Sequence, residues 1–247
     1  MLKLFKRNNK YNNSVMKNKN IKILVLVTFI VSTGYSQTNT NDFSTWFSAG
    51  LKYKLNKKWA FSVQEHLRLK ENASTTDSYF TQLGATYSLT KRFDVAVSYR
   101  YIKLHDNTGA VQGYDDYSKL QFDFSYGHKI QDFSLKYRLR YQTKNQLGVA
   151  DNSKNQTRFK AAVGYNIKGW KLDPKISAEI FNRMGAKNSS KNGFKKYRLT
   201  FGTSYTTKDI GKFGVFYRIE KEINTINPAI NNILGFKYSY TIKRKKI

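Results

Sequence analysis

The 247-residue chain carries 44 Lys and Arg against 16 Asp and Glu, a formal net charge of +28, which makes a polyanion or a membrane surface the first candidate partner. It contains no Cys, so disulfides, zinc–thiolate sites, a Cys nucleophile and a lipidated N-terminal Cys are excluded. Only two Pro beside 18 Tyr and 17 Phe favour extended strands over disorder.

The first segment has the pattern of a secretory signal peptide. A positive stretch ending at Lys22 precedes the apolar run 23–31, and small residues follow where a signal peptidase cleaves. Because this run is too short to cross a bilayer as a helix, a permanent anchor is less favoured. We therefore predict that residues 1–36 are removed on export, with Met16 as an alternative start, and that 37–42 form a short linker.

After the linker, apolar and polar residues alternate in segments of about ten to thirteen residues, which is the period of a strand and not of a helix. The segment 133–141, FSLKYRLRY, is typical: Leu and Tyr lie on one face, and Lys and Arg on the other. Similar segments cover 43–54, 59–70, 79–89, 93–104, 119–126, 133–141, 158–166, 170–183, 197–205, 213–219 and 234–242.

The connections between these segments alternate in length. The short ones are 56–58, 90–92, 130–132, 168–169 and 207–212, and the longer polar ones are 71–78, 105–116, 143–155 and 184–194. Hairpins with short turns at one end and long loops at the other are typical of an up-and-down barrel. The sequence therefore predicts an all-β fold, an antiparallel barrel of about 10 to 12 strands that forms a single domain over residues 43–247.

The barrel could face water or lipid with its apolar side. A soluble, lipocalin-like barrel has about eight strands, and a larger one needs an occupied centre, for which the sequence offers no helix. Segments of about ten residues suit a tilted strand that crosses a membrane. We therefore predict a transmembrane barrel in the cell outer membrane, with apolar residues against lipid and polar residues inside.

Aromatic residues follow the short turns at repeated positions, namely Trp59, Phe93, Phe133, Trp170 and Phe213. Amphipathic rings prefer the depth of the lipid headgroups, so this repetition predicts an aromatic girdle.

Three features do not fit a regular barrel. Glu65 falls on the apolar face, where a carboxylate requires a bulge or a partner, and Pro174 indicates an edge or a bulge. Bacterial barrels also favour even strand numbers, but eleven segments are recognised here. If the long loops are extracellular, the first segment runs inward from outside, which puts the N-terminus on the wrong side for a periplasmic start. A strand without a clear pattern, threading of residues 37–42 through the barrel, or an extracellular first turn would each account for this.

Several short motifs resemble one outer-membrane barrel family. They are Trp46, Lys58-Trp59, Glu65-x-x-Arg68, Tyr99-Arg100-Tyr101 and Arg138-x-Arg140-Tyr141. In this combination the chain after Asp42 resembles the exported family called domain of unknown function 2490. The resemblance implies a barrel in the outer membrane and brings no established activity. Since Glu65 and Arg68 share one motif, they form a candidate structural pair.

Basic residues dominate the predicted interior face. The candidate lumen-lining residues are Arg68, Arg100, Lys136, Arg138, Arg140, Arg158, Lys160, Arg198 and Arg218. They favour a structural or scaffold-like barrel whose basic lumen is held by ion pairs. The alternative is an anion-favouring, porin-like channel for small anions or acidic oligosaccharides.

The remaining function classes have less support. An outer-membrane lipid-modifying enzyme needs a nucleophile beside a base, and no G-x-S-x-G segment or metal-ligand spacing accompanies the three His. We therefore expect no catalytic residues, no metal and no cofactor. Nucleic acid is not expected, because cations and aromatics lie on opposite faces of each strand instead of forming one stacking platform. The expected partners are outer-membrane lipids, lipopolysaccharide and possible small anionic solutes, and no motif indicates an oligomeric state.

Overall fold

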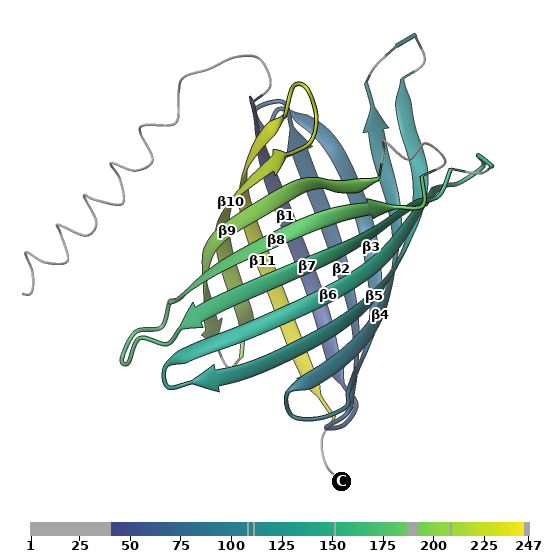
Figure 1. Cartoon of the computed structure of the whole chain (residues 1–247). Coiled ribbons are helices and arrows are strands. Elements are labelled where there is room, and N and C mark those ends of the chain that lie inside the picture. The colour runs from purple at the N-terminus through teal and green to yellow at the C-terminus, as the bar shows by residue number, and fades with distance from the viewer. Residues whose placement is uncertain are drawn as a thin grey trace, which may run out of the picture. The chain divides into compact units, whose positions relative to one another are not determined.

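The computed structural model describes residues 41–107, 109–110, 112–150, 152–186, 192–207 and 209–244, which form a closed barrel of eleven strands (Figure 1). The strands are β1 (Asn41–Lys54), β2 (Trp59–Lys70), β3 (Thr75–Ser88), β4 (Phe93–Asp106), β5 (Gly113–Ile130), β6 (Phe133–Gln146), β7 (Lys154–Tyr165), β8 (Asp173–Met184), β9 (Gly193–Thr207), β10 (Gly211–Glu222) and β11 (Ile230–Lys243). Each predicted segment corresponds to one strand, so the predicted all-β barrel and its strand number are confirmed. No helix among the described residues is long and apolar enough to cross a membrane. The predicted signal peptide lies outside these residues.

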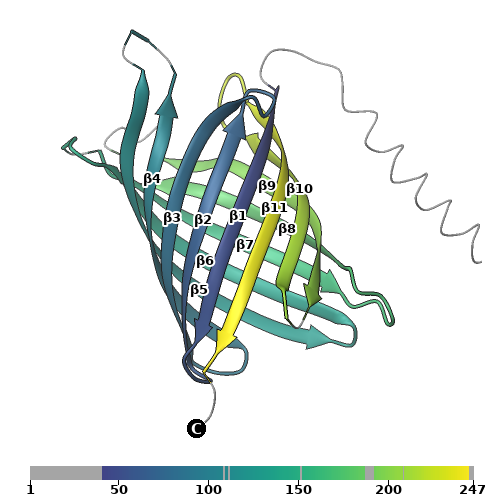
Figure 2. The ribbon, with the colours of Figure 1, turned by 180° about the vertical axis from the view of Figure 1, so that it is seen from behind.

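The barrel closes through one parallel pair. Consecutive strands are antiparallel, whereas β1 and β11 run in the same direction from Asn41 opposite Ile230 to Lys54 opposite Lys243 (Figure 2). An odd number of strands requires such a pair, because the first and last strands then point the same way. This seam accommodates the odd count without a further strand in the described residues. β1 begins at Asn41, so the last two residues of the predicted linker belong to this strand.

The period-two pattern determines which side chains face outward. On β6 the side chain of Leu139 is exposed (51%), whereas that of the next residue, Arg140, is buried (7%). Large apolar residues are exposed along every strand from β1 to β11, including Phe61 on β2 and Phe236 on β11. The outer surface is therefore apolar over much of its area, and polar side chains are turned inward.

The two ends of the barrel differ in their connections, which we call the short-turn end and the long-loop end. At the short-turn end, Asn56 Oδ1 accepts hydrogen bonds from the backbone N–H groups of Lys58 (2.8 Å) and Trp59 (2.7 Å). Thr90 Oγ1 accepts in the same way from the N–H of Phe93 (3.0 Å). These side-chain caps fix the turns so that each following strand starts with an aromatic residue.

Trp170 departs from the predicted girdle pattern. The strand β8 begins only at Asp173, so Trp170 lies in the preceding turn, where it is 58% exposed. Pro174 is the second residue of β8, beyond the last paired residue of β7, and no bulge accompanies it. The register irregularity of β8 lies instead between Phe181 and Asn182.

The loop predicted over 71–78 is shorter than expected, since β3 begins at Thr75. Glu71, Asn72 and Ala73 all have positive φ angles of 55–63°, a conformation that is unfavourable for residues with a side chain. The carboxylate of Asp42 accepts hydrogen bonds from the backbone N–H groups of Glu71 (3.2 Å) and Asn72 (3.0 Å). A contact from β1 therefore stabilises this tight turn, which local sequence does not reveal.

Candidate functional site

The interior of the barrel contains a cavity of about 950 Å³. Eight of the nine candidate lumen-lining residues line it: Arg68, Arg100, Arg138, Arg140, Arg158, Lys160, Arg198 and Arg218. The ninth, Lys136, is on the same face of β6 as Arg138 but lies nearer the short-turn end and is exposed. Side chains from distant parts of the sequence thus meet in one chamber.

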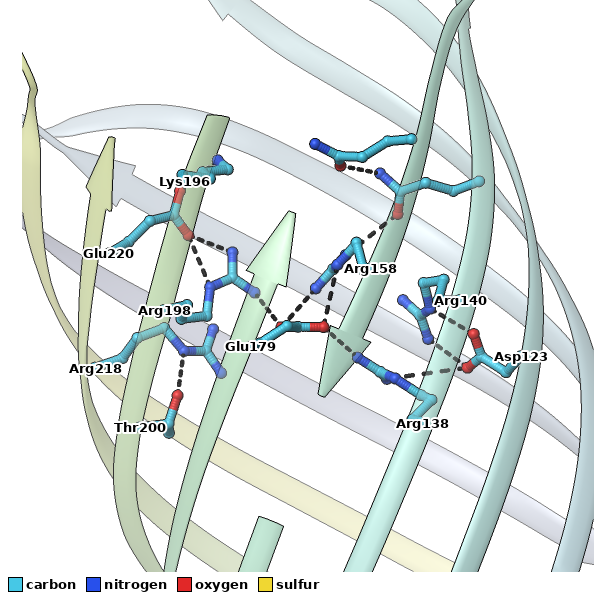
Figure 3. Close-up of polar contacts among 12 residues, drawn as sticks. Asp123, Arg138, Arg140, Arg158, Glu179, Lys196, Arg198, Thr200, Arg218 and Glu220 are labelled. Atoms are coloured by element: carbon cyan, nitrogen blue, oxygen red, sulfur yellow. Dashed lines mark hydrogen bonds and ion pairs between the residues drawn. The ribbon is translucent and has the colours of Figure 1, made fainter. Parts of the chain in front are cut away.

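Glu179 on β8 is the centre of a polar network in this chamber (Figure 3). Its side chain is only 3% exposed and accepts from three guanidinium groups. Arg138 Nη2 lies 2.6 Å from Oε1, Arg158 Nη2 lies 2.8 Å from Oε2, and Arg198 Nη1 lies 3.3 Å from Oε2. One buried carboxylate therefore joins strands β6, β7 and β9 through charge-assisted hydrogen bonds.

Two further carboxylates extend the network on either side (Figure 3). Asp123 on β5 accepts a forked pair from Arg140, with Nε–Oδ1 of 2.5 Å and Nη2–Oδ2 of 2.6 Å. Glu220 on β10 accepts from Arg198 Nε at 2.8 Å and from Lys196 Nζ at 2.5 Å. The network consequently connects six neighbouring strands, β5 to β10.

Strand register explains why these charges meet. Asp123 and Arg140 are directly opposite each other on β5 and β6, Glu179 faces Arg198 on β9, and Arg198 faces Glu220 on β10. Directly opposite residues on one face of an antiparallel pair have Cβ atoms about 5 Å apart, which suits an ion pair. Each carboxylate of the network therefore lies directly opposite an arginine, although Arg138 also faces Lys160 and Arg140 faces Arg158.

Aromatic rings also lie inside the barrel, although the sequence pattern places most aromatics outside. The Trp46 ring on β1 lies 3.9 Å from Arg68 Cζ, 5.0 Å from Arg218 Cζ and 5.6 Å from Arg198 Cζ. Such distances are those of cation–π contacts, which partly compensate a buried guanidinium. Trp46 thus joins cations from both sides of the β1–β11 seam.

Phe80 on β3, Phe181 on β8 and Phe216 on β10 are buried as well, at 2–7% exposure. Phe216 fits because Gly235 on β11 has no side chain: an added Cβ there would lie 1.9 Å from Phe216 Cζ. Sequence reasoning did not list these rings as interior residues. The alternation within each strand could have identified them as interior residues, since Phe80 shares a face with Gln82 and Phe216 shares one with Arg218.

Several cavity cations have no carboxylate partner among the described residues. They are Lys52, Arg68, Arg100, Lys119, Lys160, Arg218 and Lys237. Neutral groups contact some of them: Arg100 Nε donates to Gln82 Oε1 (2.5 Å), and Arg218 Nε donates to Thr200 Oγ1 (3.0 Å). The interior therefore combines a region of ion pairs with cations that have no directly bonded carboxylate.

The predicted pair of Glu65 and Arg68 is not formed in the structure. Glu65 is exposed on the outer face of β2, where Thr81 Oγ1 donates to its carboxylate at 3.0 Å. Arg68 is three residues further along, so alternation turns it into the interior. The register irregularity of β2 also lies beyond Arg68 and does not displace Glu65.

Polar groups at the long-loop end are tied together outside the strands. Asn107 Nδ2 donates to Glu71 Oε1 at 2.9 Å, and Lys70 Nζ donates to Asn107 Oδ1 at 2.6 Å. The hydrogen bond from Asn107 stabilises the ionised form and lowers the pKa of Glu71 below its ordinary value. The turns after β2 and β4 are thereby linked.

Five of the motif residues that carry the family resemblance lie in this interior. Trp46, Arg68, Arg100, Arg138 and Arg140 come from four strands and all line the cavity. A family model described as "Protein of unknown function (DUF2490)" matches residues 43–228, and the chain belongs to this family. No curated protein matches the chain.

Proposed function

We propose that the protein is an outer-membrane β-barrel whose outer surface contacts lipid. The apolar belt supports this proposal, since large apolar side chains are exposed on successive strands and would be unfavourable in water. Trp59 and Trp170 near the short turns fit the headgroup depth, whereas Trp46 lies in the cavity.

Fluorescence quenching by brominated lipids tests this arrangement. In vesicles, we expect bromine on the acyl chains to quench the parent protein strongly. The Trp59→Phe/Trp170→Phe variant retains only Trp46, and we expect it to be quenched much less. Equal quenching of the two proteins, or no quenching of the parent, would contradict the proposed membrane position.

We further propose that the interior is a basic, rigid scaffold. The observation that carries this proposal is the network around Glu179, which links β5 to β10 through fixed ion pairs. Side chains held in this way fill part of the lumen and resist deformation of the barrel. In planar bilayers we expect no large, stable conductance. Conductance typical of a wide, water-filled channel would contradict the scaffold proposal.

An anion-favouring pathway is the second candidate, and the charge of the cavity lining supports it. Thirteen Lys or Arg residues line the cavity, against five Asp or Glu. An excess of cations lowers the electrostatic barrier for anions. If small conductance events occur, their reversal potential in a salt gradient should indicate anion preference, and replacement of Arg138 and Arg140 by Gln should reduce it. Cation preference would exclude this candidate.

Lipid-modifying catalysis has less support from the positions of the histidines. His66 stacks on Phe80, with ring centroids 4.3 Å apart, and His105 and His128 lie against tyrosine rings. Packing of this kind is typical of structural histidines. A lipid-hydrolysis assay with His66→Ala as control would reveal an activity that these contacts do not indicate.

A further inference from the structure

We propose that the cavity contains a binding site for a small phosphate-type oxyanion, formed by Arg68, Arg100 and Lys119. The inference deepens the proposed function, because it rests on a polar barrel interior, but it does not require conduction. All three residues line the cavity, and none has a carboxylate partner among the described residues.

Strand register brings the cations of this site together. Arg100 on β4 is directly opposite Lys119 on β5, and Lys119 is directly opposite Lys144 on β6. Like charges in directly opposite positions are destabilising. The row through Glu179 also has two cations opposite each other, Arg138 and Lys160, but it contains two carboxylates, since Glu179 and Glu220 both lie opposite Arg198. The row that runs from Gln82 through Arg100, Lys119 and Lys144 to Lys154 contains no carboxylate, so its cations lie side by side without a directly opposite acid.

Phe80 contacts two of the guanidinium groups. The Cζ atoms of Arg68 and Arg100 both lie 4.8 Å from the centre of its ring. Trp46 supports Arg68 from another side at 3.9 Å. The rings position the planar cations and supply apolar walls, but they carry no full negative charge that would neutralise them.

Buried polar nitrogens without a partner lie at the same place. Arg68 Nε is buried and has no hydrogen-bond partner among the described residues, and neither has Nε2 of His66, whose ring stacks on Phe80. Gln82 Oε1 fixes Arg100 by accepting from its Nε, which leaves the two terminal nitrogens of that guanidinium for a ligand. Two guanidinium forks and an ammonium group match the geometry and charge of a phosphate group.

Fluorescence of Trp46 offers a direct readout, because Arg68 lies against its ring. The parent for this experiment is the Trp59→Phe/Trp170→Phe protein, folded in detergent and checked for heat-modifiable migration. Inorganic phosphate is titrated against chloride at equal ionic strength. We expect a saturable change with phosphate and none with chloride. A phosphate response no larger than that of chloride would overturn the proposal without any further variant.

Variants then locate the site. Arg68→Gln and Arg100→Gln should each weaken phosphate binding at least about tenfold, because each removes charge-assisted hydrogen bonds. Arg92→Gln removes the same charge from an exposed turn, and its binding should equal that of the parent. Equal weakening by Arg92→Gln would indicate nonspecific attraction and contradict a defined site.

The source of the phosphate group is distinguished in the same assay. Short-chain phosphatidic acid carries the group on a lipid, whereas the cavity lies inside the barrel. We expect free phosphate to bind and the lipid to compete poorly, and binding of the lipid alone would overturn the proposal. Lipid quenching and conductance test the membrane barrel separately, so either proposal can fail without the other.

Discussion

Replacement of Glu179 by Gln is the most direct test of the interior network. The carboxylate accepts from Arg138, Arg158 and Arg198, and its side chain is 3% exposed. The substitution preserves the size of the side chain but removes its charge, and its NH₂ group then faces guanidinium donors. Removal of one partner from a buried ion pair costs about 3–5 kcal/mol, because the remaining charge stays buried without compensation. We expect a loss of this size in the free energy of unfolding.

Urea titration of the barrel in lipid vesicles measures that free energy, with heat-modifiable migration as a check that the variant folds. Glu222→Gln is the matched control, since Glu222 ends β10 and is exposed. We expect no measurable change for this control. Combining Glu179→Gln with Arg158→Gln should cost less than the sum of the single losses, because the second change removes an uncompensated charge. If Glu179→Gln is as stable as Glu222→Gln, the network does not hold the barrel together.

Two other substitutions test the packing and the apolar outer surface. Gly235→Ala should destabilise the barrel by about 1–3 kcal/mol, since the added Cβ would collide with the Phe216 ring. Gly127→Ala is its control, because the nearest atom to an added Cβ is Leu135 O at 3.6 Å, and equal losses would argue against steric exclusion. Glu65→Gln should raise stability in vesicles by about 1 kcal/mol, because it removes a charge from the outer face. A loss of stability in the same urea titration would show that the ionised carboxylate, with its hydrogen bond from Thr81, stabilises the barrel.

The positions of the strands, and the side of the barrel to which each side chain points, could be predicted from the sequence because both depend on alternation between adjacent residues. The segment 133–141 illustrates this: Leu139 faces outward and Arg140 is buried, as its pattern predicts. Turn lengths were less predictable, because distant contacts also determine them. Asp42 holds the turn at Glu71 from a strand 29 residues earlier, so the predicted loop contains the start of β3.

The partners of the interior charges could not be predicted in the same way. Alternation shows that Glu179 and Arg138 face inward, but their contact depends on the register of three strands and on the tilt of the barrel. The cation–π contacts of Trp46 with Arg218 cross the β1–β11 seam, which forms only when the barrel closes. The predicted pair of Glu65 and Arg68 does not form, because residues three apart on a strand face opposite sides of the sheet.

The ion-pair network around Glu179 and the cations without a carboxylate partner should respond differently to substitution, because we assign the first to stability and the second to anion binding. If every inward cation served only to hold the barrel, removing any of them would cost stability. Arg100 instead lies directly opposite Lys119 and has no carboxylate partner among the described residues, so Arg100→Gln relieves a like-charge contact. We expect this variant to unfold at the same or a higher urea concentration than the parent while it loses phosphate affinity. A loss as large as that of Glu179→Gln would instead place Arg100 in the structural network and remove the reason to assign it to an anion.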